Sequence, residues 1–313
     1  MTIYGGGLAA IGKTPLVRLN RVVPDNAAEV WVKLEGGNPT GSYKDRIAIS
    51  VLKAALERGA VHPGDTIVEF TGGSTGTALA YVAAVLGLKF TAIFSDAFSA
   101  SKQLAMEAFG ATVLVEKSLD GTITHELAER MKARALALAK EPSHYYADQF
   151  GSPDVRRGYV PLGQEIVEAL GDTVDMFCTA VGTGAALMGT LDGLQQGGAS
   201  PQVVAIEPAQ APLLTTGTTH GHKVEGIAVF PNPPFLDRGV LRDIRVVDQD
   251  RGFAMCRRLA REEGIFGGGS TGLNVCAAID LAVELGPGKR VVTLSCDNGA
   301  KYLGGHIYNA AKG

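Results

Sequence analysis

The stretch DTIVEFTGGSTGTALAYVAAVLGLKFTAIFS, residues 65–95, contains one complete strand–helix–strand unit. Residues 65–70 and 89–95 are short runs rich in β-branched and aromatic residues, which are typical of buried strands. Between them lie a turn of glycine and hydroxyl residues and then an apolar stretch of helix-forming residues. Two strands joined by a helix predict parallel pairing within one sheet.

The same alternation extends along most of the chain. Further strands are predicted at residues 29–35, 111–116, 176–181, 202–208, 243–248 and 291–296. Helices are predicted after Ser42, over residues 101–110 and around residues 122–140. The pattern predicts an α/β fold with mostly parallel sheets that helices cover on both faces. A length of 313 residues favours two domains.

Ligands of such folds bind at the loops beyond the carboxyl ends of the strands. The loops predicted to bind ligands therefore follow Glu35, Phe70, Val181 and Pro208. The loops after Glu35, Phe70 and Val181 are also rich in glycine, which lets the backbone approach a ligand closely.

Composition and charge argue against several classes of partner. The formal net charge is −3, and basic residues occur only in short clusters such as Arg156-Arg157, so no nucleic-acid partner is expected. No apolar run is long enough to span a membrane, and the first residues lack the pattern of a signal peptide. The four cysteines form no CxxC pair, and the six histidines show no metal-ligand spacing. We therefore expect a cytoplasmic protein that acts on small molecules and has no metal site.

Lys44, in the stretch GGNPTGSYKDRIA at residues 36–48, is the first candidate for chemistry. Asn38 to Gly41 is a turn signal, and Ser42 with Asp45 resembles a helix capping box. Lys44 is therefore predicted to lie in the first turn of a helix. The helix dipole favours anions at that end, so a lysine there suggests a role as a nucleophile. The alternative is an ordinary surface lysine.

Three glycine-rich turns are the other candidates, because each precedes a predicted helix and points main-chain N–H groups at one place. They are EFTGGSTGTALA (69–80), AVGTGAALMG (180–189) and FGGGSTGLNV (266–275). The second turn is not a complete GxGxxG, since Leu187 stands in place of the third glycine, and NAD binding is therefore disfavoured. In the third turn, Ser270 is either a ligand contact or a simple helix N-cap.

With these motifs in this order, the sequence resembles the fold-type II enzymes that depend on pyridoxal 5′-phosphate (PLP). Within them it is similar to the cysteine synthase (O-acetylserine sulfhydrylase) and cystathionine β-synthase group. The most specific part is NPTGS-x-KDR within KLEGGNPTGSYKDRIA (33–48). The resemblance covers nearly the whole chain, through IGKTPLVRL (11–19), TGGSTGT (71–77), SASKQLAMEAFGATVLV (99–115), ADQF (147–150), VGTGAA (181–186), IEP (206–208), HKVEGIA (222–228) and GGSTG (268–272).

The resemblance implies a tryptophan synthase β-like architecture of two three-layer αβα domains with PLP between them. The smaller domain, residues 38–145, would carry the PLP lysine and the loop that binds the substrate carboxylate. The larger domain, residues 1–37 plus 146–313, would carry the phosphate loop and a serine at the pyridine nitrogen. A homodimer is implied as well.

The resemblance also implies a role for each matching residue. Lys44 matches the lysine that binds PLP covalently and later moves the Cα proton. Ser270 matches the serine at the pyridine nitrogen, and Gly226 lies on the loop that shapes the far side of the site. The phosphate loop matches Gly182, Thr183, Gly184, Ala185 and Ala186. The contacts to the substrate carboxylate match Thr71, Gly72, Gly73, Ser74, Thr75 and Gln149, with Ser74 also at the position that touches the cofactor's ring oxygen.

The activity implied is β-replacement on an activated serine such as O-acetylserine, through an aminoacrylate, with sulfide as the nucleophile. A hydroxyl cannot hold the pyridine nitrogen protonated, so loss of a β-leaving group is favoured over a long-lived carbanion. Two other PLP reactions stay open, which are β-elimination to pyruvate and ammonia and replacement by an amine to give a diamino acid. A PLP-binding protein without catalysis is a further alternative.

Several positions depart from the family pattern. The carboxylate loop usually reads Thr-Ser-Gly-Asn-Thr-Gly, but here Gly72 replaces the serine and Ser74 the asparagine. The phosphate loop usually reads Gly-Thr-Gly-Gly-Thr, but here Ala185 and Ala186 replace the last two residues and remove one hydroxyl. Tyr43 stands beside Lys44 where a smaller residue is common. These changes lie mainly on the substrate side of the implied site, so the identity of the substrate stays open.

Overall fold

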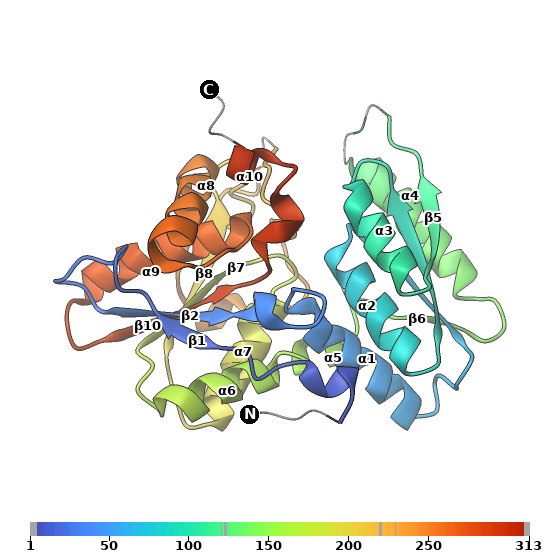
Figure 1. Ribbon diagram of the computed structural model, residues 1–313, viewed down its shortest axis with the longest axis horizontal. Coiled ribbons are helices and arrows are strands. Elements are labelled where there is room, and N and C mark those ends of the chain that lie inside the picture. The colour runs from blue at the N-terminus through green and yellow to red at the C-terminus, as the bar shows by residue number, and fades with distance from the viewer. Residues whose placement is uncertain (1–4, 120, 122–123, 219–220, 229, 310–313) are drawn as a thin grey trace. The chain divides into compact units, whose positions relative to one another are not determined.

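The computed structural model describes residues 5–309 except 120, 122–123, 219–220 and 229. Contacts divide the chain into two compact units, each of which combines two segments of the sequence. The first unit comprises Met1–Ile11 and Lys44–Gly158, and the second comprises Gly12–Tyr43 and Tyr159–Gly313. Each unit contains a sheet with helices packed against it (Figure 1).

Within the described residues of the first unit, four strands form one parallel sheet in the order β5-β4-β3-β6. The strands are β3 (Thr66–Phe70), β4 (Lys89–Ser95), β5 (Thr112–Glu116) and β6 (His144–Tyr146). The helices are η1 (Gly7–Ala10), α1 (Lys44–Glu57), α2 (Ser74–Val85), α3 (Ala100–Ala108), α4 (His125–Leu138) and α5 (Pro153–Arg157).

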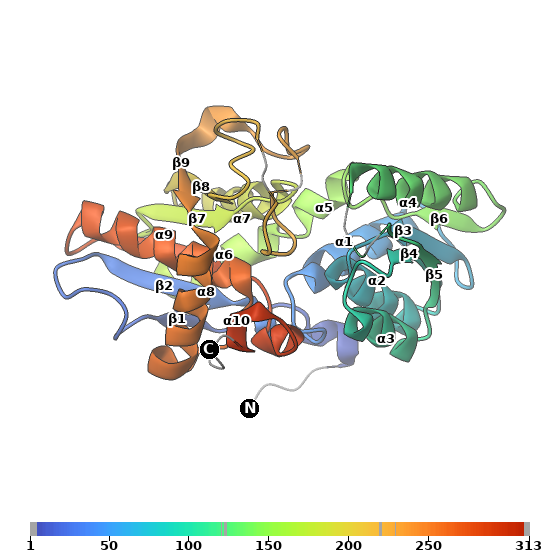
Figure 2. The same ribbon diagram turned by 90° about the horizontal axis from the view of Figure 1, so that it is seen from above.

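The connections of this sheet explain why helices cover both of its faces. The chain runs from β3 through α2 to β4 and through α3 to β5, so right-handed crossovers place α2 and α3 on one face. The chain then returns through α4 to β6, on the opposite side of β3, and α4 therefore covers the other face (Figure 2). Under α4 lies a core of Val68, Ile93, Leu127, Met131 and Ala135.

In the described part of the second unit, six strands form a sheet in the order β1-β2-β10-β7-β8-β9. All neighbours pair in parallel except β1, which pairs antiparallel with β2 at the edge. The strands are β1 (Leu16–Arg18), β2 (Glu29–Leu34), β7 (Met176–Ala180), β8 (Gln202–Pro208), β9 (Leu241–Val247) and β10 (Arg290–Ser295). The helices are η2 (Glu35–Gly37), α6 (Val160–Leu170), α7 (Ala185–Gln196), η3 (Arg238–Val240), α8 (Gln249–Arg258), the π-helix η4 (Leu259–Glu263), α9 (Gly269–Leu285), η5 (Gly299–Tyr302) and α10 (His306–Asn309).

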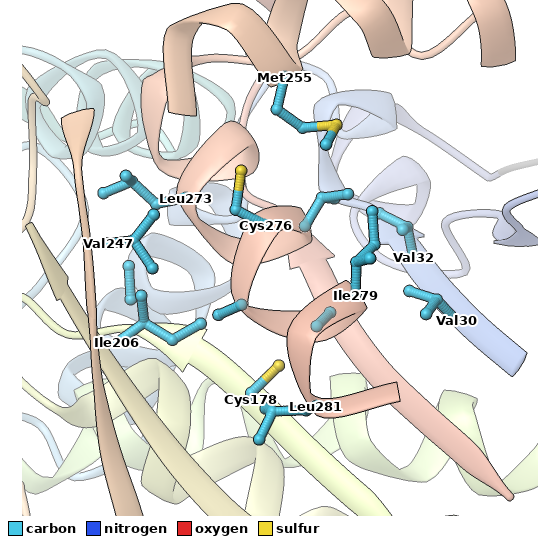
Figure 3. Packing of buried hydrophobic residues seen from close by; sticks show 14 of the residues in the cluster. Val30, Val32, Cys178, Ile206, Val247, Met255, Leu273, Cys276, Ile279 and Leu281 are labelled. Carbon is cyan, nitrogen blue, oxygen red and sulfur yellow. The ribbon is translucent and has the colours of Figure 1, made fainter. Parts of the chain in front are cut away.

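The core of the second unit forms around α9, which packs directly on the sheet, and α8 packs on α9 (Figure 3). Alternate strand residues point to the same face of a sheet. The strands accordingly supply pairs two residues apart, such as Val30 with Val32 and Val204 with Ile206. Since α9 is apolar on nearly all sides, it is buried along most of its length. None of the helices in the described ranges is long and apolar enough to cross a membrane.

The structure confirms the predicted fold class of parallel sheets covered by helices. All eight predicted strands are present, most with ends within one residue of the prediction. The short strands β1 and β6 were not predicted. The predicted helix at 122–140 corresponds to α4, and residues 122–123 lie outside the described residues.

The compact units have different boundaries from the expected domains of 38–145 and the remainder. Residues 38–43 belong with the second unit, where the Tyr43 N–H donates to the Cys296 carbonyl at 3.0 Å. Residues 146–158 belong with the first unit, where the Ser50 hydroxyl donates to the Asp154 carbonyl at 2.8 Å and Arg58 forms an ion pair with Asp154. The domain division implied by the resemblance stays a prediction, and the compact units are used below.

Candidate functional site

Lys44 is the first residue of α1, as its sequence predicts. The segment before it is held by Asn38, whose side-chain amide donates to the Glu35 carboxylate at 2.9 Å and accepts from the Gly12 N–H at 2.8 Å. Tyr43 then packs its ring against Tyr159, with the ring centroids 5.3 Å apart. The turn that leads into α1 is therefore fixed by side chains and not only by glycines.

The loop from Thr71 to Thr75 connects the carboxyl end of β3 to the start of α2. The Thr71 hydroxyl oxygen accepts hydrogen bonds from the N–H groups of Gly73 at 3.0 Å and Gly76 at 3.1 Å. Because these two bonds use both lone pairs, the hydroxyl hydrogen is left to donate to a ligand. The N–H groups of Ser74 and Thr75 have no partner inside the helix, as is general for a first helical turn. The loop therefore presents donors suited to a carboxylate.

Gly73 needs to be glycine for two reasons. Its φ of 130° is a conformation that other residues rarely adopt. A Cβ atom added there would also lie 2.2 Å from the Lys102 Cδ atom, because the aliphatic part of Lys102 runs along the loop. The loop is thus packed closely against the start of α3.

Gln149 lies beside this loop because it follows β6 by three residues, and β6 pairs in parallel with β3. The Gln149 side chain donates to the Phe70 carbonyl at 2.8 Å, and its main-chain N–H donates to Glu69 Oε2 at 2.9 Å. The second Glu69 oxygen accepts from the Phe70 N–H at 2.9 Å. Burial raises the pKa of Glu69 to about 8. Loss of water on burial raises the pKa of Tyr146, and the nearby charge of Glu69 raises it further.

A small pocket shows which of the predicted residues of the first unit lie together. Thr75, Gln149 and Glu69 line it, with Ile47 and Ala48 from the first turns of α1, and the rest of its lining is Val51, Leu79, Ala147 and Val155. The helix of Lys44, the carboxylate loop and Gln149 therefore gather around one point at the carboxyl ends of β3 and β6.

In the second unit, the loop from Gly182 to Ala186 connects the carboxyl end of β7 to α7. Gly184 is the N-cap of α7 in the left-handed conformation, with φ 86°. A Cβ atom at Gly182 would lie 2.5 Å from the Gly226 carbonyl oxygen, so the predicted residue Gly226 packs directly on this loop. The Thr183 carbonyl accepts from the Phe235 N–H at 3.0 Å, which fixes the middle of the loop. A helix N-terminus approached only by glycine backbone is a good site for a phosphate.

Ser270 is the second residue of α9, and it is 7% exposed. The N-cap of α9 is Gly268, and no side chain caps this helix end. The alternative that Ser270 is a simple N-cap is therefore wrong.

Asn274 stands one helical turn after Ser270 on the same side of α9, and it is fully buried. Its amide oxygen accepts from the Ala180 N–H at 2.7 Å, and its amide nitrogen donates to the Leu294 carbonyl at 2.8 Å. Asn274 thus fixes the start of α9 against the carboxyl ends of β7 and β10, next to the glycine loop. The sequence motif FGGGSTGLNV includes Asn274, but only the pairing of β7 with β10 shows its role.

The cysteines and acidic residues offer no second centre in the described part of the chain. No group of three or more His, Cys, Asp or Glu residues there is placed to hold a metal ion. All four cysteines are buried free thiols. Burial raises the pKa of Cys178 and Cys256 to about 12, so these thiols stay protonated and unreactive at neutral pH.

The chain is similar to known proteins along nearly its whole length. Residues 8–297 match the family described as pyridoxal-phosphate dependent enzyme. A cysteine synthase of Staphylococcus aureus is 38% identical over 306 residues, which are 96% of this chain and 95% of that protein. An O-ureido-L-serine synthase of Streptomyces lavendulae is 34% identical over 99% of this chain and 94% of its own.

Solved structures agree with this similarity. The crystal structure of an O-ureido-L-serine synthase superposes with a TM-score of 0.91 at 33% identity, covering 100% of this chain and 98% of that one. An O-acetylserine sulfhydrylase isoform of Entamoeba histolytica gives a TM-score of 0.89 at 30% identity, covering 98% and 92%. The chain therefore belongs to the family of pyridoxal-phosphate dependent enzymes.

Proposed function

We propose that this enzyme carries out β-replacement on an activated L-serine, with O-acetylserine as the first substrate and sulfide as the nucleophile. The observation that carries the proposal is the buried hydroxyl of Ser270 at the start of α9, which has no capping role. In the proposal, this hydroxyl faces the pyridine nitrogen of PLP. A hydroxyl there favours loss of a β-leaving group over a stabilised carbanion. A cysteine synthase related over 96% of the chain supports the same reaction.

The residues of the second unit fit the phosphate of PLP. Gly182 and Gly184 have no room for a side chain, since added Cβ atoms would lie 2.5 Å from the Gly226 oxygen and 2.7 Å from the Leu236 nitrogen. Backbone alone therefore forms the cradle at the N-terminus of α7, where the helix dipole attracts an anion. Thr183 supplies the hydroxyl of this loop, and its oxygen accepts from the Ala185 N–H at 3.3 Å, so Ala185 holds the hydroxyl in place while Ala186 would supply a main-chain N–H group.

The residues of the first unit fit the lysine bond and the substrate. Lys44 at the start of α1 would bind the cofactor's aldehyde carbon through Nζ. The Thr71 hydroxyl and the N–H groups of Ser74 and Thr75 would hold the substrate carboxylate, with Gln149 as a further contact. Ser74 is also proposed to touch the cofactor ring.

When bound, PLP withdraws electrons from the bonds at the substrate's Cα, which makes the Cα proton acidic and the β-leaving group easier to lose. With the substrate bound, Lys44 Nζ would take the Cα proton. The carboxylate contacts from Thr71 to Thr75 fix the rotation of the substrate so that this proton faces Lys44. Acetate leaves, and sulfide adds at Cβ to give cysteine.

A second nucleophile class is supported by a specific observation. The O-ureido-L-serine synthase of Streptomyces lavendulae is 34% identical to this chain. The product in its name has oxygen, not sulfur, bonded to Cβ. The altered loop of this chain, with Gly72 and Ser74, lies on the substrate side. β-Replacement with a nitrogen or oxygen nucleophile, including an amine that would give a diamino acid, is therefore the second candidate. β-Elimination to pyruvate and ammonia is the third.

We further propose that the enzyme works as a homodimer in the cytoplasm, without nucleic-acid or membrane partners. Four buried free thiols suit a reducing compartment, where cysteines remain unpaired. A net charge of −3 offers no attraction for a polyanion. Light scattering of the purified protein tests the dimer.

Product analysis tests the reaction. The purified protein loaded with PLP is incubated with O-acetylserine and, in separate samples, sulfide, hydroxyurea, ammonia or no nucleophile. Cysteine formed with the highest kcat/KM supports the first proposal, and a preference for hydroxyurea or ammonia supports the second candidate. Release of pyruvate that does not depend on a nucleophile supports elimination. Absence of acetate release in every sample contradicts the choice of O-acetylserine.

A further inference from the structure

The structure gives a physical reason for glycine at position 72, where related loops usually carry serine. Gly72 is not among the glycines with positive φ, so its backbone conformation suits any residue. This distinguishes it from its neighbour Gly73, whose φ of 130° requires glycine. The reason for glycine at position 72 must therefore lie in what surrounds it.

The ring of Phe98 occupies the space beside Gly72. A Cβ atom added at Gly72 would lie 3.0 Å from Phe98 Cε1, 3.3 Å from Cζ and 3.5 Å from Cδ1. These atoms belong to a rigid ring and not to the flexible end of a long side chain. A serine at position 72 would therefore have to displace the ring to place its hydroxyl.

Phe98 lies in the connection from β4 to α3 and is fixed by its own packing. Its ring lies against Phe94, with the centroids 5.3 Å apart. It also packs on the hydrophobic cluster of Val68, Ile93 and Leu127 between the sheet and α4. The ring is half-buried, so one part is anchored in the core and the rest borders the loop from Thr71 to Thr75.

We propose that Phe98 and Gly72 act as a pair that determines how the enzyme binds the carboxylate of its amino-acid substrate. The inference rests on the proposed function, in which the loop from Thr71 to Thr75 holds that carboxylate. The Phe98 ring replaces a serine hydroxyl at this face and excludes water from the loop. With less water to compete, the hydrogen bonds from Thr71, Ser74 and Thr75 to the carboxylate are stronger. Phe98 therefore determines how tightly the enzyme binds the carboxylate of its amino-acid substrate.

The pairing predicts a particular pattern among four proteins, which are wild type, Phe98→Ala, Gly72→Ser and the double variant. Phe98→Ala admits water and is expected to raise the KM for O-acetylserine about tenfold, with kcat changed less than about threefold. Gly72→Ser is expected to raise KM at least as much, because the serine meets the ring. In the double variant the serine has room and restores a donor, so its KM is lower than that of either single variant.

Phe109→Ala is the matched control, because Phe109 is a partly exposed ring of the same unit that packs on Tyr81, outside the loop. It is expected to leave KM unchanged. The visible absorbance of lysine-bound PLP is recorded for each variant, so that loss of cofactor is separated from loss of substrate binding. Equal KM values for Phe98→Ala and Phe109→Ala, or additive effects in the double variant, would overturn the pairing.

The dissociation constant of L-cysteine, read from the shift of the PLP absorbance, gives the same comparison without turnover. The inference therefore remains testable if O-acetylserine is not the substrate. In that case the proposed function fails, but the four dissociation constants still test the pairing. The pairing predicts that the double variant binds L-cysteine more tightly than either single variant. Unchanged affinity in Phe98→Ala by this measurement contradicts the pairing.

Discussion

The Glu69 carboxyl accepts a hydrogen bond from the Gln149 main-chain N–H, with Glu69 Oε2 2.9 Å from the Gln149 nitrogen. The Gln149 side chain in turn donates to the carbonyl of Phe70, the residue after Glu69, at 2.8 Å. These two bonds join the segment after β6 to the end of β3, and Glu69 and Gln149 are 80 positions apart in the sequence. Glu69 is therefore a positioning residue for Gln149, the proposed carboxylate contact.

The burial of Glu69 makes the stability of the protein depend on pH. The pKa of Glu69 is raised from 4.5 to about 8, so the folded state keeps a proton that the unfolded chain has lost between these values. The folded state binds more protons there, and the free energy of unfolding falls as pH rises through this window. Glu69→Gln cannot titrate, so its unfolding free energy is expected to fall less than that of wild type. Urea unfolding from about pH 5 to about pH 9 measures the difference.

The matched control is Glu57→Gln, because Glu57 is exposed on α1. This variant is expected to follow the wild-type pH dependence. If the curves of wild type and Glu69→Gln run parallel across the window, Glu69 is ionised in the folded protein and the account of its burial is wrong.

Thr71 is expected to stabilise the carboxylate loop through its hydroxyl. Thr71→Val removes the acceptor of the Gly73 and Gly76 N–H groups, which costs about 1–2 kcal/mol of unfolding free energy. It also removes the proposed donor to the substrate, so the KM for O-acetylserine rises. Thr71→Ser keeps the hydroxyl and is expected to stay close to wild type in KM. A Thr71→Ser variant as impaired as Thr71→Val would show that the methyl group matters and the hydroxyl does not.

Asn274 is expected to couple the start of α9 to the phosphate loop. Asn274→Ala leaves the Ala180 N–H and the Leu294 carbonyl without partners in the core, at a cost of about 1–3 kcal/mol for each group. PLP affinity, measured by absorbance after dialysis and titration, is expected to fall as well. Asn20→Ala, on the surface, serves as the control. Normal PLP affinity in a folded Asn274→Ala protein would contradict the coupling.

Gly184 and Gly198 form a matched pair of left-handed glycines, with φ 86° and 93°. An added Cβ at Gly198 meets nothing within 4 Å, whereas at Gly184 it meets the Leu236 nitrogen at 2.7 Å. Gly198→Ala is expected to cost only the conformational penalty of about 1–2 kcal/mol. Gly184→Ala is expected to lose more stability and to release PLP. Thermal unfolding with and without added PLP compares the two variants. Equal losses of stability in both would contradict the proposal that the phosphate binds at Gly184.

The periodic parts of the fold were predictable from the sequence because their signals are local. Eight strands stand out as short runs of β-branched residues between glycine turns, and parallel pairing then brings their carboxyl ends together. The turn before Lys44 and the capping pair around it predict that Lys44 lies in the first turn of a helix, and the structure places it at the first position of α1. β6 was not predicted because three residues, His144 to Tyr146, are too few to show a pattern.

The remaining site residues depend on contacts between distant positions and therefore give no local signal. Glu69 resembles an ordinary strand residue until β6 brings Gln149 beside it. Phe98 resembles a core aromatic residue, and only its contact with Gly72 explains the missing serine. The roles proposed for Lys44, Ser270 and the phosphate loop stay predictions, since they concern a ligand.

The attachment of PLP to Lys44 is the central claim, and borohydride reduction tests it most directly. The protein loaded with PLP is reduced, which makes the bond between lysine and cofactor permanent, and is then digested and examined by peptide mass spectrometry. The account predicts a phosphopyridoxyl group on the peptide that contains Lys44, and its loss in Lys44→Ala. A modified peptide containing Lys102, Lys33 or any lysine other than Lys44 would contradict it.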